Sequence, residues 1–334
     1  MKNKIYKVGG LFSGVGGIEL GFQKTKKFKI AWSTDFDKYS AKTHRANYKH
    51  NFIESDINQI NGSDLDAVDI LVGGFPCQAF SVAGYQKGFE DKRGEVFFQI
   101  IRIINELPKK PKILLLENVK NILTHDKKNT FRVIQDALEK TGYCVFSKIL
   151  NTSEYTPIPQ NRERTFIVCF LEGKDALLDP TKPMCREFQT LFPPKILNQT
   201  KPIGDFLETE EVDEKYYYRQ DKYNYRELVG SITKKDTVYQ WRRIYVRENK
   251  SGVCPTLTAN MGTGGHNVPL IKDDHGIRKL TPRECFNLQG FPRDFKFPES
   301  VPNSQLYKQA GNSVTVEMVR VLAKIIYKVL SISE

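Results

Sequence analysis

The sequence lacks the marks of membrane, secreted and repetitive proteins. It has no apolar run near the roughly 20 residues that a membrane-spanning helix needs. Its start, MKNKIYKVGGLF, lacks the apolar stretch and the small-residue cleavage site of a signal peptide. No internal repeat or low-complexity block interrupts its 334 residues. We therefore expect a soluble cytoplasmic protein of about two domains, taking roughly 150 residues per domain, with no membrane partner.

Patterns of metal and disulfide chemistry are also missing. The chain has six cysteines, but no two form a C-x-x-C pair, and its five histidines do not stand at metal-ligand spacing. A disulfide framework is not expected in a chain this long without a signal peptide. We therefore expect no metal, and we expect Cys144 and Cys169, within apolar runs, to be small buried apolar residues.

Acidic residues are in deficit. Lysine and arginine number 51 against 39 aspartates and glutamates, which gives a net charge of +12. An excess of this size favours a polyanionic partner, with nucleic acid as the first candidate. A basic surface that serves solubility alone is the alternative.

The first half of the chain alternates strand-like and helix-like segments. We expect strands at 5–12, 28–33, 68–72, 112–116, 143–150 and 165–170, and helices at 37–48, 95–107 and 131–138. This alternation predicts an α/β fold with a doubly wound, mostly parallel sheet.

The second half is less regular. Proline-rich segments at 179–183 and 192–194 are typical of linkers, and helical patterns return only at 282–288 and 315–330. We predict a smaller, irregular, β-rich domain inserted before a C-terminal helix that returns to the first domain. The predicted boundaries are 1–182 completed by 303–334 for the first domain, 183–280 for the second, and 281–302 for a hinge.

One cysteine stands apart from the others. Cys77 follows Pro76 where the apolar run 68–72 gives way to a glycine-rich turn, Gly73-Gly74-Phe75-Pro76-Cys77. Strands of open α/β folds bind ligands at their carboxyl ends, and proline restrains the backbone beside it. A thiol held there is a candidate covalent nucleophile.

A glycine-rich turn follows the first strand. Phe12-Ser13-Gly14-Val15-Gly16-Gly17 can bring backbone N–H groups close to a ligand, although a tight strand-to-helix turn is an equal alternative. Asp35 ends the second strand, where an acid can bind ribose hydroxyls or cap a helix. Asp56 has the same two interpretations. Glu19 at the helix entrance disfavours a pyrophosphate and suits a nucleoside cofactor without one.

Two charged clusters follow later strands. Glu117 ends the strand at 112–116, next to the strand that leads to Cys77, so we expect the two side chains to lie close together. A helix N-cap or a surface acid is the alternative. Arg162 and Arg164 enter the strand at 165–170, and alternation would send both to one face. Two guanidinium groups there suit an anionic or carbonyl-bearing ligand, with an exposed charged edge as the alternative.

Together these motifs identify a family. The chain resembles the DNA cytosine-5 methyltransferases, particularly the compact bacterial restriction–modification members, over nearly its whole length. The motifs run in the family's order: FSGVGG, an acid after the second strand, GGFPCQAFS, ENV, QNRER, a variable region, RECFNLQGFP and QAGNSV. Asp35 departs from the glutamate of many members, which shortens the ribose contact but keeps the charge.

The resemblance implies methyl transfer from S-adenosylmethionine to C5 of a cytosine flipped out of duplex DNA, with S-adenosylhomocysteine as product. Cys77 would bond to ring C6, and Glu117 would contact N3 and the exocyclic amine. Arg164 would hold the O2 carbonyl and orient Cys77, with Arg162 as its supporting neighbour. The implied donor site comprises Phe12, Gly14, Gly16, Gly17, Asp35, Phe36, Asp56, Ile57, Pro76, Asn312, Ser313 and Val314.

The resemblance also implies a DNA surface. The segment 78–95 would close over the flipped base, and the second domain would read the sequence. The implied DNA-binding residues are Gln78, Ser81, Lys87, Arg93, Arg242, Arg243, Tyr245, Thr256, Leu257, Gly264 and Gly265. Arg243 is the first choice for a guanine contact, although strand alternation could select Arg242 instead.

The implied partners are double-stranded DNA, on which the protein would act as a monomer, and a restriction endonuclease that forms no stable complex with it. Three alternatives remain. Transfer-RNA cytosine methyltransferases usually carry a Cys-Phe-Thr segment, which this sequence lacks. An NAD-dependent oxidoreductase would leave Cys77, Glu117 and Arg164 unexplained. The intact cysteine, glutamate and arginines argue against a catalytically dead DNA-binding relative.

Overall fold

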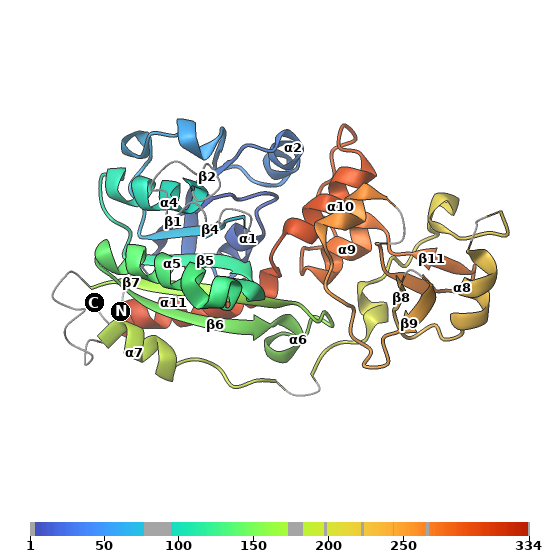
Figure 1. The fold of residues 1–334 in the computed structure, drawn as a ribbon. Coiled ribbons are helices and arrows are strands. Elements are labelled where there is room, and N and C mark those ends of the chain that lie inside the picture. The colour runs from blue at the N-terminus through green and yellow to red at the C-terminus, as the bar shows by residue number, and fades with distance from the viewer. Residues whose placement is uncertain are drawn as a thin grey trace. The chain divides into compact units, whose positions relative to one another are not determined.

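The computed structural model describes residues 4–76, 95–172, 183–196, 199–221, 224–242, 244–264 and 267–332. The chain divides into two compact units (Figure 1). Unit 1 comprises 1–150, 163–194 and 318–334, and unit 2 comprises 151–162 and 195–317. Residues 303–317 thus fall in unit 2, whereas the predicted boundaries assign them to the first domain. The division of the chain into domains by function stays a prediction.

Unit 1 is built on a seven-stranded sheet with the order β3-β2-β1-β4-β5-β7-β6. The strands are β1 (Tyr6–Leu11), β2 (Phe28–Asp35), β3 (Asn51–Glu54), β4 (Ile70–Gly74), β5 (Ile113–Val119), β6 (Tyr143–Asn151) and β7 (Glu163–Leu171). β1 to β5 pair in parallel, and β7 runs antiparallel to β5. The predicted mostly parallel sheet is confirmed. Because the chain reverses its direction of winding between β1 and β4, their carboxyl ends form the switch point where such folds bind ligands.

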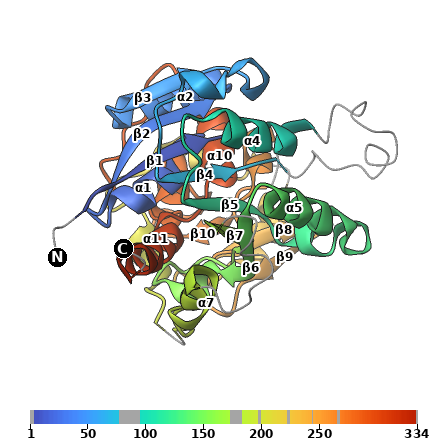
Figure 2. The ribbon, with the colours of Figure 1, turned by 90° about the vertical axis from the view of Figure 1, so that its left-hand side faces the viewer.

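Helices cover both faces of this sheet (Figure 2). The α-helices among the described residues are α1 (Gly17–Gln23), α2 (Lys38–Asn47), α4 (Glu95–Glu106), α5 (Asn129–Lys140), α6 (Thr152–Tyr155), α7 (Pro183–Thr190), α8 (Tyr225–Ser231), α9 (Pro282–Leu288), α10 (Asn303–Asn312) and α11 (Val316–Ile332). No helix in the described part of the chain is long and apolar enough to cross a lipid bilayer.

The two faces have separate apolar cores. On one face, α4 and α5 bury side chains such as Phe97 and Ile134 against strand residues such as Leu114. On the other face, the ring of Phe28 lies 4.9 Å from that of Phe22 in α1 and 6.1 Å from that of Tyr327 in α11. Burial on both faces explains why these strands have near-continuous apolar sequences.

Unit 2 contains a four-stranded antiparallel sheet with the order β11-β10-β8-β9. The strands are β8 (Tyr239–Arg242), β9 (Tyr245–Glu248), β10 (Leu270–Lys272) and β11 (Ile277–Lys279). A buried ion pair supports it, because the Arg278 guanidinium donates to both carboxyl oxygens of Glu284 at 2.7 and 2.8 Å. The predicted smaller β-rich region is therefore confirmed.

The structure adds elements that the sequence pattern did not predict. β3 has four residues, none of them buried, and the strands of unit 2 have three or four residues each, too few for a periodic pattern. α10 was also missed. Its Gly311 lies so close to the backbone of Thr258 and Ala259 that an added Cβ would collide with them.

The expectation for Cys144 is wrong. Its sulfur is bonded to that of Cys185, which joins β6 to α7 across 41 residues of sequence. Glu172 lies beside the pair, close enough for the three groups to share an ion if the sulfurs were not bonded to each other. Cys169, Cys254 and Cys285 are buried and free. Sequence spacing could not reveal the pair because the fold alone brings these two Cα atoms to 6.4 Å.

Candidate active site

The glycine-rich turn after β1 is tied to the end of β2. Phe12, Gly14 and Gly16 have φ angles of 53°, 52° and 82°, which is an unusual conformation for phenylalanine and one that glycine adopts freely. The Gly14 N–H donates to Asp35 Oδ2 at 2.7 Å, and the Ser13 N–H donates to the Thr34 carbonyl at 2.9 Å. The turn at the switch point is therefore tied to its neighbouring strand, β2.

Asp35 is not the helix cap that the sequence left as an alternative. Asp37 caps α2 through bonds from two backbone N–H groups to its Oδ1. The second oxygen of Asp35 accepts from the Asp37 N–H at 2.8 Å, and burial raises the pKa of the Asp35 carboxyl. Phe36 beside it is 70% exposed, so a large aromatic face is available at the same strand end.

Asp56 and Ile57 follow β3. Asp56 does act as a cap, since its Oδ1 accepts from the Asn58 N–H at 2.9 Å. Ile57 is buried in the core beneath the sheet edge. A ligand at this position would therefore meet main-chain atoms of Ile57 more than its side chain.

A buried polar chain supports the glycine-rich turn from below. Ser33 Oγ donates to Glu19 Oε1 at 3.3 Å and lies 2.9 Å from His50 Nε2. His50 Nε2 lies 2.9 Å from His44 Nε2, and His44 Nδ1 donates to the Gly14 carbonyl at 3.1 Å. The chain of contacts thus ends on the turn itself.

Burial sets the charges along this chain. It raises the pKa of Glu19 to about 7 and lowers those of His44 and His50 to about 3 and about 4. Both imidazoles are therefore neutral at pH 7. Glu19, the acid at the helix entrance, is 1% exposed and so lies inside the protein.

The structure brings Glu117 and Arg164 together. Arg164 stands opposite Val119 in the β5–β7 ladder, diagonal to Glu117, and its Nε lies 3.1 Å from Glu117 Oε1. Both side chains are largely buried, at 16% and 14% exposure. Glu117 also pairs with Gly74 of β4, three residues before Cys77 in the sequence. A carboxyl and a guanidinium therefore meet beside the strand that leads to Cys77.

Asn118 was not among the predicted site residues. Its side-chain amide is buried, and Nδ2 donates to the Phe75 carbonyl at 2.9 Å. This bond fixes the backbone just before Pro76 and Cys77. The ENV motif, in which Asn118 follows Glu117, was the indication in the sequence that could have found it.

Arg162 has partners of a different kind from those of Arg164. It lies before β7 begins, so strand alternation does not apply to it. Within unit 2 its buried guanidinium donates to the carbonyls of Leu257 at 2.7 Å, Gly311 at 3.0 Å and Ser313. Arg162 thus fastens the segment around Leu257 to the end of α10. The residues there, Asn312, Ser313 and Val314, are the ones predicted to contact the methyl donor.

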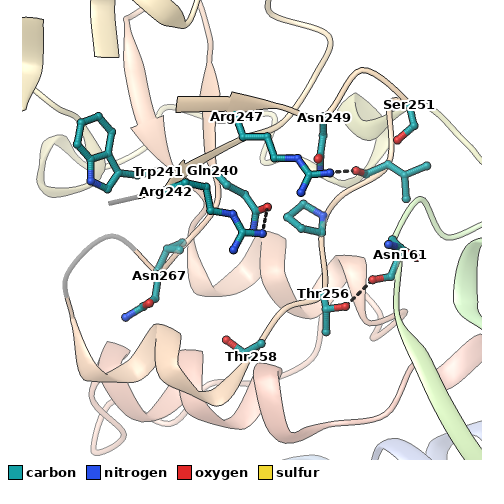
Figure 3. A pocket seen from close by; sticks show the side chains of 13 residues that line it. Asn161, Gln240, Trp241, Arg242, Arg247, Asn249, Ser251, Thr256, Thr258 and Asn267 are labelled. Carbon is teal, nitrogen blue, oxygen red and sulfur yellow. Dashed lines mark hydrogen bonds between the residues drawn. The ribbon is translucent and has the colours of Figure 1, made fainter. Parts of the chain in front are cut away.

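Unit 2 has a polar cavity of about 420 Å³, called the polar cleft below, between the β8–β9 hairpin and the segment 253–258 (Figure 3). The predicted residues Arg242 and Thr256 line it, whereas Leu257 is buried. Tyr245 is 57% exposed on the hairpin, and Gly264 has a φ of 82°. Arg247 and Gln240, which were not predicted, also line the polar cleft.

Several predicted residues lie outside the described part of the chain. They are Cys77, Gln78, Ser81, Lys87, Arg93, Arg243 and Gly265. The predicted closing segment 78–95 lies outside it as well, apart from the start of α4.

Comparison with known proteins identifies relatives along the full chain. Residues 6–328 match the family model of the C-5 cytosine-specific DNA methylases. The type II methyltransferase M.Bsp6I of Bacillus sp. (strain RFL6) is 50% identical over 325 residues, which cover 96% of this chain and 98% of that protein. The type II methyltransferase M.HhaI of Haemophilus parahaemolyticus is 35% identical over 325 residues, covering 94% and 91%.

Solved structures show the same fold at low sequence identity. The methyltransferase EhMeth of Entamoeba histolytica matches with a TM-score of 0.74 at 18% identity, over 98% of this chain and 99% of that one. The Dnmt2 methyltransferase of S. pombe matches with a TM-score of 0.72 at 19% identity, over 99% and 100%.

Proposed function

This chain belongs to the C-5 cytosine-specific DNA methylase family, and we propose that it methylates cytosine within one short sequence of duplex DNA, as the modification enzyme of a restriction–modification system. As a DNA cytosine-5 methyltransferase, it has the substrate that its basic charge suggested. The observation that carries the proposed site is the Glu117–Arg164 pair, at 3.1 Å, beside the strand that precedes Cys77.

The proposed chemistry begins with the Cys77 thiolate. Carbon 5 of cytosine is a poor nucleophile, so sulfur first bonds to C6 and the ring electrons shift toward N3 and C5. Glu117 places a proton or hydrogen bond at N3, where the negative charge develops. Arg164, fixed by Glu117, holds the O2 carbonyl. After C5 has taken the methyl group, a base removes its proton and the C6–sulfur bond breaks.

A free thiol has a pKa near 8.5, so a small fraction of Cys77 would be thiolate at neutral pH without help. Asn118 holds the backbone carbonyl of Phe75, two residues before Cys77 in the sequence, and the ring of Pro76 restricts its own backbone. The cytosine must also leave the base stack, which costs a few kcal/mol. Contacts that form as the segment 78–95 closes over the extruded base would offset part of this free-energy cost.

The residues at the switch point fit S-adenosylmethionine, the donor that the family implies. The turn leaves open space above Gly14, where nothing lies within 4 Å of an added Cβ. Asp35 offers a carboxylate for ribose hydroxyls, and the exposed ring of Phe36 offers a face for adenine. When bound, this group supplies the electrophilic methyl. Phe12, Gly16, Gly17, Asp56, Ile57, Pro76, Asn312, Ser313 and Val314 are the other proposed contacts.

Replacement of the proposed nucleophile tests this function. Cys77→Ala should abolish transfer of tritiated methyl groups to DNA, while binding of the donor and of duplex DNA persists. Cys254→Ala is the matched control, because that thiol is buried and its replacement should leave transfer near the wild-type rate. Bisulfite sequencing of the wild-type product would map the modified cytosines. Substantial methyl transfer by the Cys77→Ala protein would exclude the mechanism.

A covalent trap tests the same step in the wild-type enzyme. Duplex DNA with 5-fluorocytosine at the modified position cannot lose a C5 proton, so the enzyme should remain bonded to the DNA through Cys77. Peptide mapping that finds no adduct at Cys77, in the presence of donor, would count against the proposal.

A further inference from the structure

The open face of the β8–β9 hairpin presents two guanidinium groups to the polar cleft (Figure 3). Arg242 and Arg247 are both exposed and stand on neighbouring strands. Gln240 lies directly opposite Arg247, and its Oε1 accepts a hydrogen bond from Arg242 Nη2 at 3.0 Å. The Gln240 amide therefore orients one positive group on the same face that carries the other.

The facing wall of the polar cleft is fixed before any ligand arrives. Thr256 Oγ1 donates to the Asn161 carbonyl at 2.6 Å, and the Asn161 N–H donates to the Cys254 carbonyl at 2.8 Å. The next residue, Leu257, is held through its carbonyl by buried Arg162. A wall of this kind loses little conformational freedom on binding, which favours affinity.

The lining of the polar cleft suits an anion. Its polar groups are two guanidiniums, side-chain amides and hydroxyls, and none of its thirteen described lining residues is Asp or Glu. Arginine, asparagine, glutamine, serine and threonine are all among the side chains that contact DNA phosphates and sugars.

The shape of the polar cleft favours a phosphate over a base as its ligand. Base edges in a duplex lie at the floor of a groove, so the side chains that read them must protrude. A recessed cavity of about 420 Å³ instead receives a group that projects from the DNA, as the sugar–phosphate backbone does. We propose that the polar cleft binds a phosphodiester group of one DNA strand, with Arg242 and Arg247 supplying the charge.

This proposal rests on the proposed action on duplex DNA. It gives Arg242 and Arg247 a role in binding the DNA backbone rather than in reading bases. Phosphate contacts fix the register and orientation of a protein on DNA but carry no sequence information. Arg242 and Arg247 would therefore place the enzyme on the strand. Selection of bases would fall to other residues, among them Arg243.

Salt dependence tests the proposal in the full-length enzyme. For Arg247→Ala and Arg242→Ala, binding is measured from 50 to 200 mM salt, on a duplex that contains the methylated site and on an unrelated duplex. Each lost phosphate contact should lower the slope of log affinity against log salt by about 0.9, so the affinity lost over this range becomes about 3.5-fold smaller. Both duplexes should weaken by the same factor, and the bisulfite pattern should not change.

Arg226→Ala is the matched control, because Arg226 is an exposed arginine of α8 that does not line the polar cleft. It should keep the wild-type slope. Thermal unfolding of each variant checks that the fold persists. A second measurement replaces single phosphodiesters by neutral methylphosphonates. One such linkage should weaken the wild-type enzyme but cause no further loss in Arg247→Ala.

The remaining outcomes are distinguishable. An unchanged salt slope and affinity in both variants would overturn the proposal. A changed methylated sequence with an unchanged slope would also overturn it and make the arginines base readers. If wild-type enzyme failed to methylate duplex DNA at all, the proposed function itself would fall.

Discussion

The carboxyl edge of the large sheet in unit 1 and the polar cleft of unit 2 hold their side chains by different means. Glu117 belongs to a seven-residue strand paired on both sides, and Arg164 meets it through ladder register. The polar cleft is built from a hairpin of four-residue strands and a loop that distant side chains fasten. Regular strands therefore position the proposed chemistry, while irregular segments position the proposed DNA contacts.

The largest expected effect tests the strand-built site. Glu117→Gln keeps the size of the side chain but removes its charge, so the N3 contact and the orientation of Arg164 both weaken. Methyl transfer at saturating donor and DNA should fall by about 10²–10⁴-fold. Glu163→Gln is the control, since Glu163 pairs with Lys120 and is 40% exposed. A loss below tenfold would remove Glu117 from the proposed chemistry.

The next effect contrasts the two neighbouring arginines. Arg162→Met leaves three buried carbonyl groups without their donor, so the free energy of unfolding should fall by roughly 3 kcal/mol or more. Arg164→Met should cost less stability but more activity, because its partner is the carboxyl group of Glu117. Urea unfolding and methyl-transfer rates measure both. Equal losses of stability in the two variants would contradict the proposal that Arg162 holds the structure of unit 2 while Arg164 faces the substrate.

Removing the Cys144–Cys185 disulfide tests how much it adds to the stability that strand pairing gives unit 1. Cys144→Ser should lower the free energy of unfolding by roughly 2–4 kcal/mol in the oxidised protein, because the link constrains a long loop of the unfolded chain. With a reductant present, wild type and variant should unfold alike. Cys169→Ser is the control, because Cys169 is buried and free. It measures the change in the free energy of unfolding when a cysteine is replaced without loss of a disulfide. Stability of the wild type that does not respond to reductant would show that the bond does not form in solution.

The smallest effect concerns the base of the glycine-rich turn. Burial raises the pKa of Glu19 from its ordinary 4.5 to about 7, so the folded protein binds more protons than the unfolded one between these values. Stability should therefore fall as pH rises from about 4.5 to about 7, by at most roughly 3 kcal/mol. Glu19→Gln should remove this slope.

Thermal unfolding across this pH range measures the slope, with Glu54→Gln as the control because Glu54 is an exposed acid of the same unit. Two pH profiles of the same shape for wild type and Glu19→Gln would show that the carboxyl does not titrate there.

Much of unit 1 could be predicted because its sequence pattern is local. Apolar runs such as 112–116 mark strands that are buried on both faces, and Glu117 follows directly from the end of one. The neighbouring positions of Glu117 and the strand leading to Cys77 could be anticipated from the order of the motifs. Asn118 was missed although it is adjacent, since nothing in the sequence shows that its amide reaches the Phe75 carbonyl.

Less of unit 2 could be predicted, because its contacts join residues that are far apart in the sequence. The partners of Arg162 lie 95 to 151 positions away in the sequence. Arg247 is one of several basic residues in its segment, and only the pairing of β8 with β9 places it opposite Gln240.

The sequence by itself determined the alternating strands and helices, the order of the motifs and the basic charge, because local apolar periodicity and residue chemistry express these directly. The tertiary structure decided which arginine meets Glu117, which one fastens unit 2, which cysteines are bonded and where a polar cleft opens. These depend on contacts between residues far apart in the chain, whose distances are set only when the core packs.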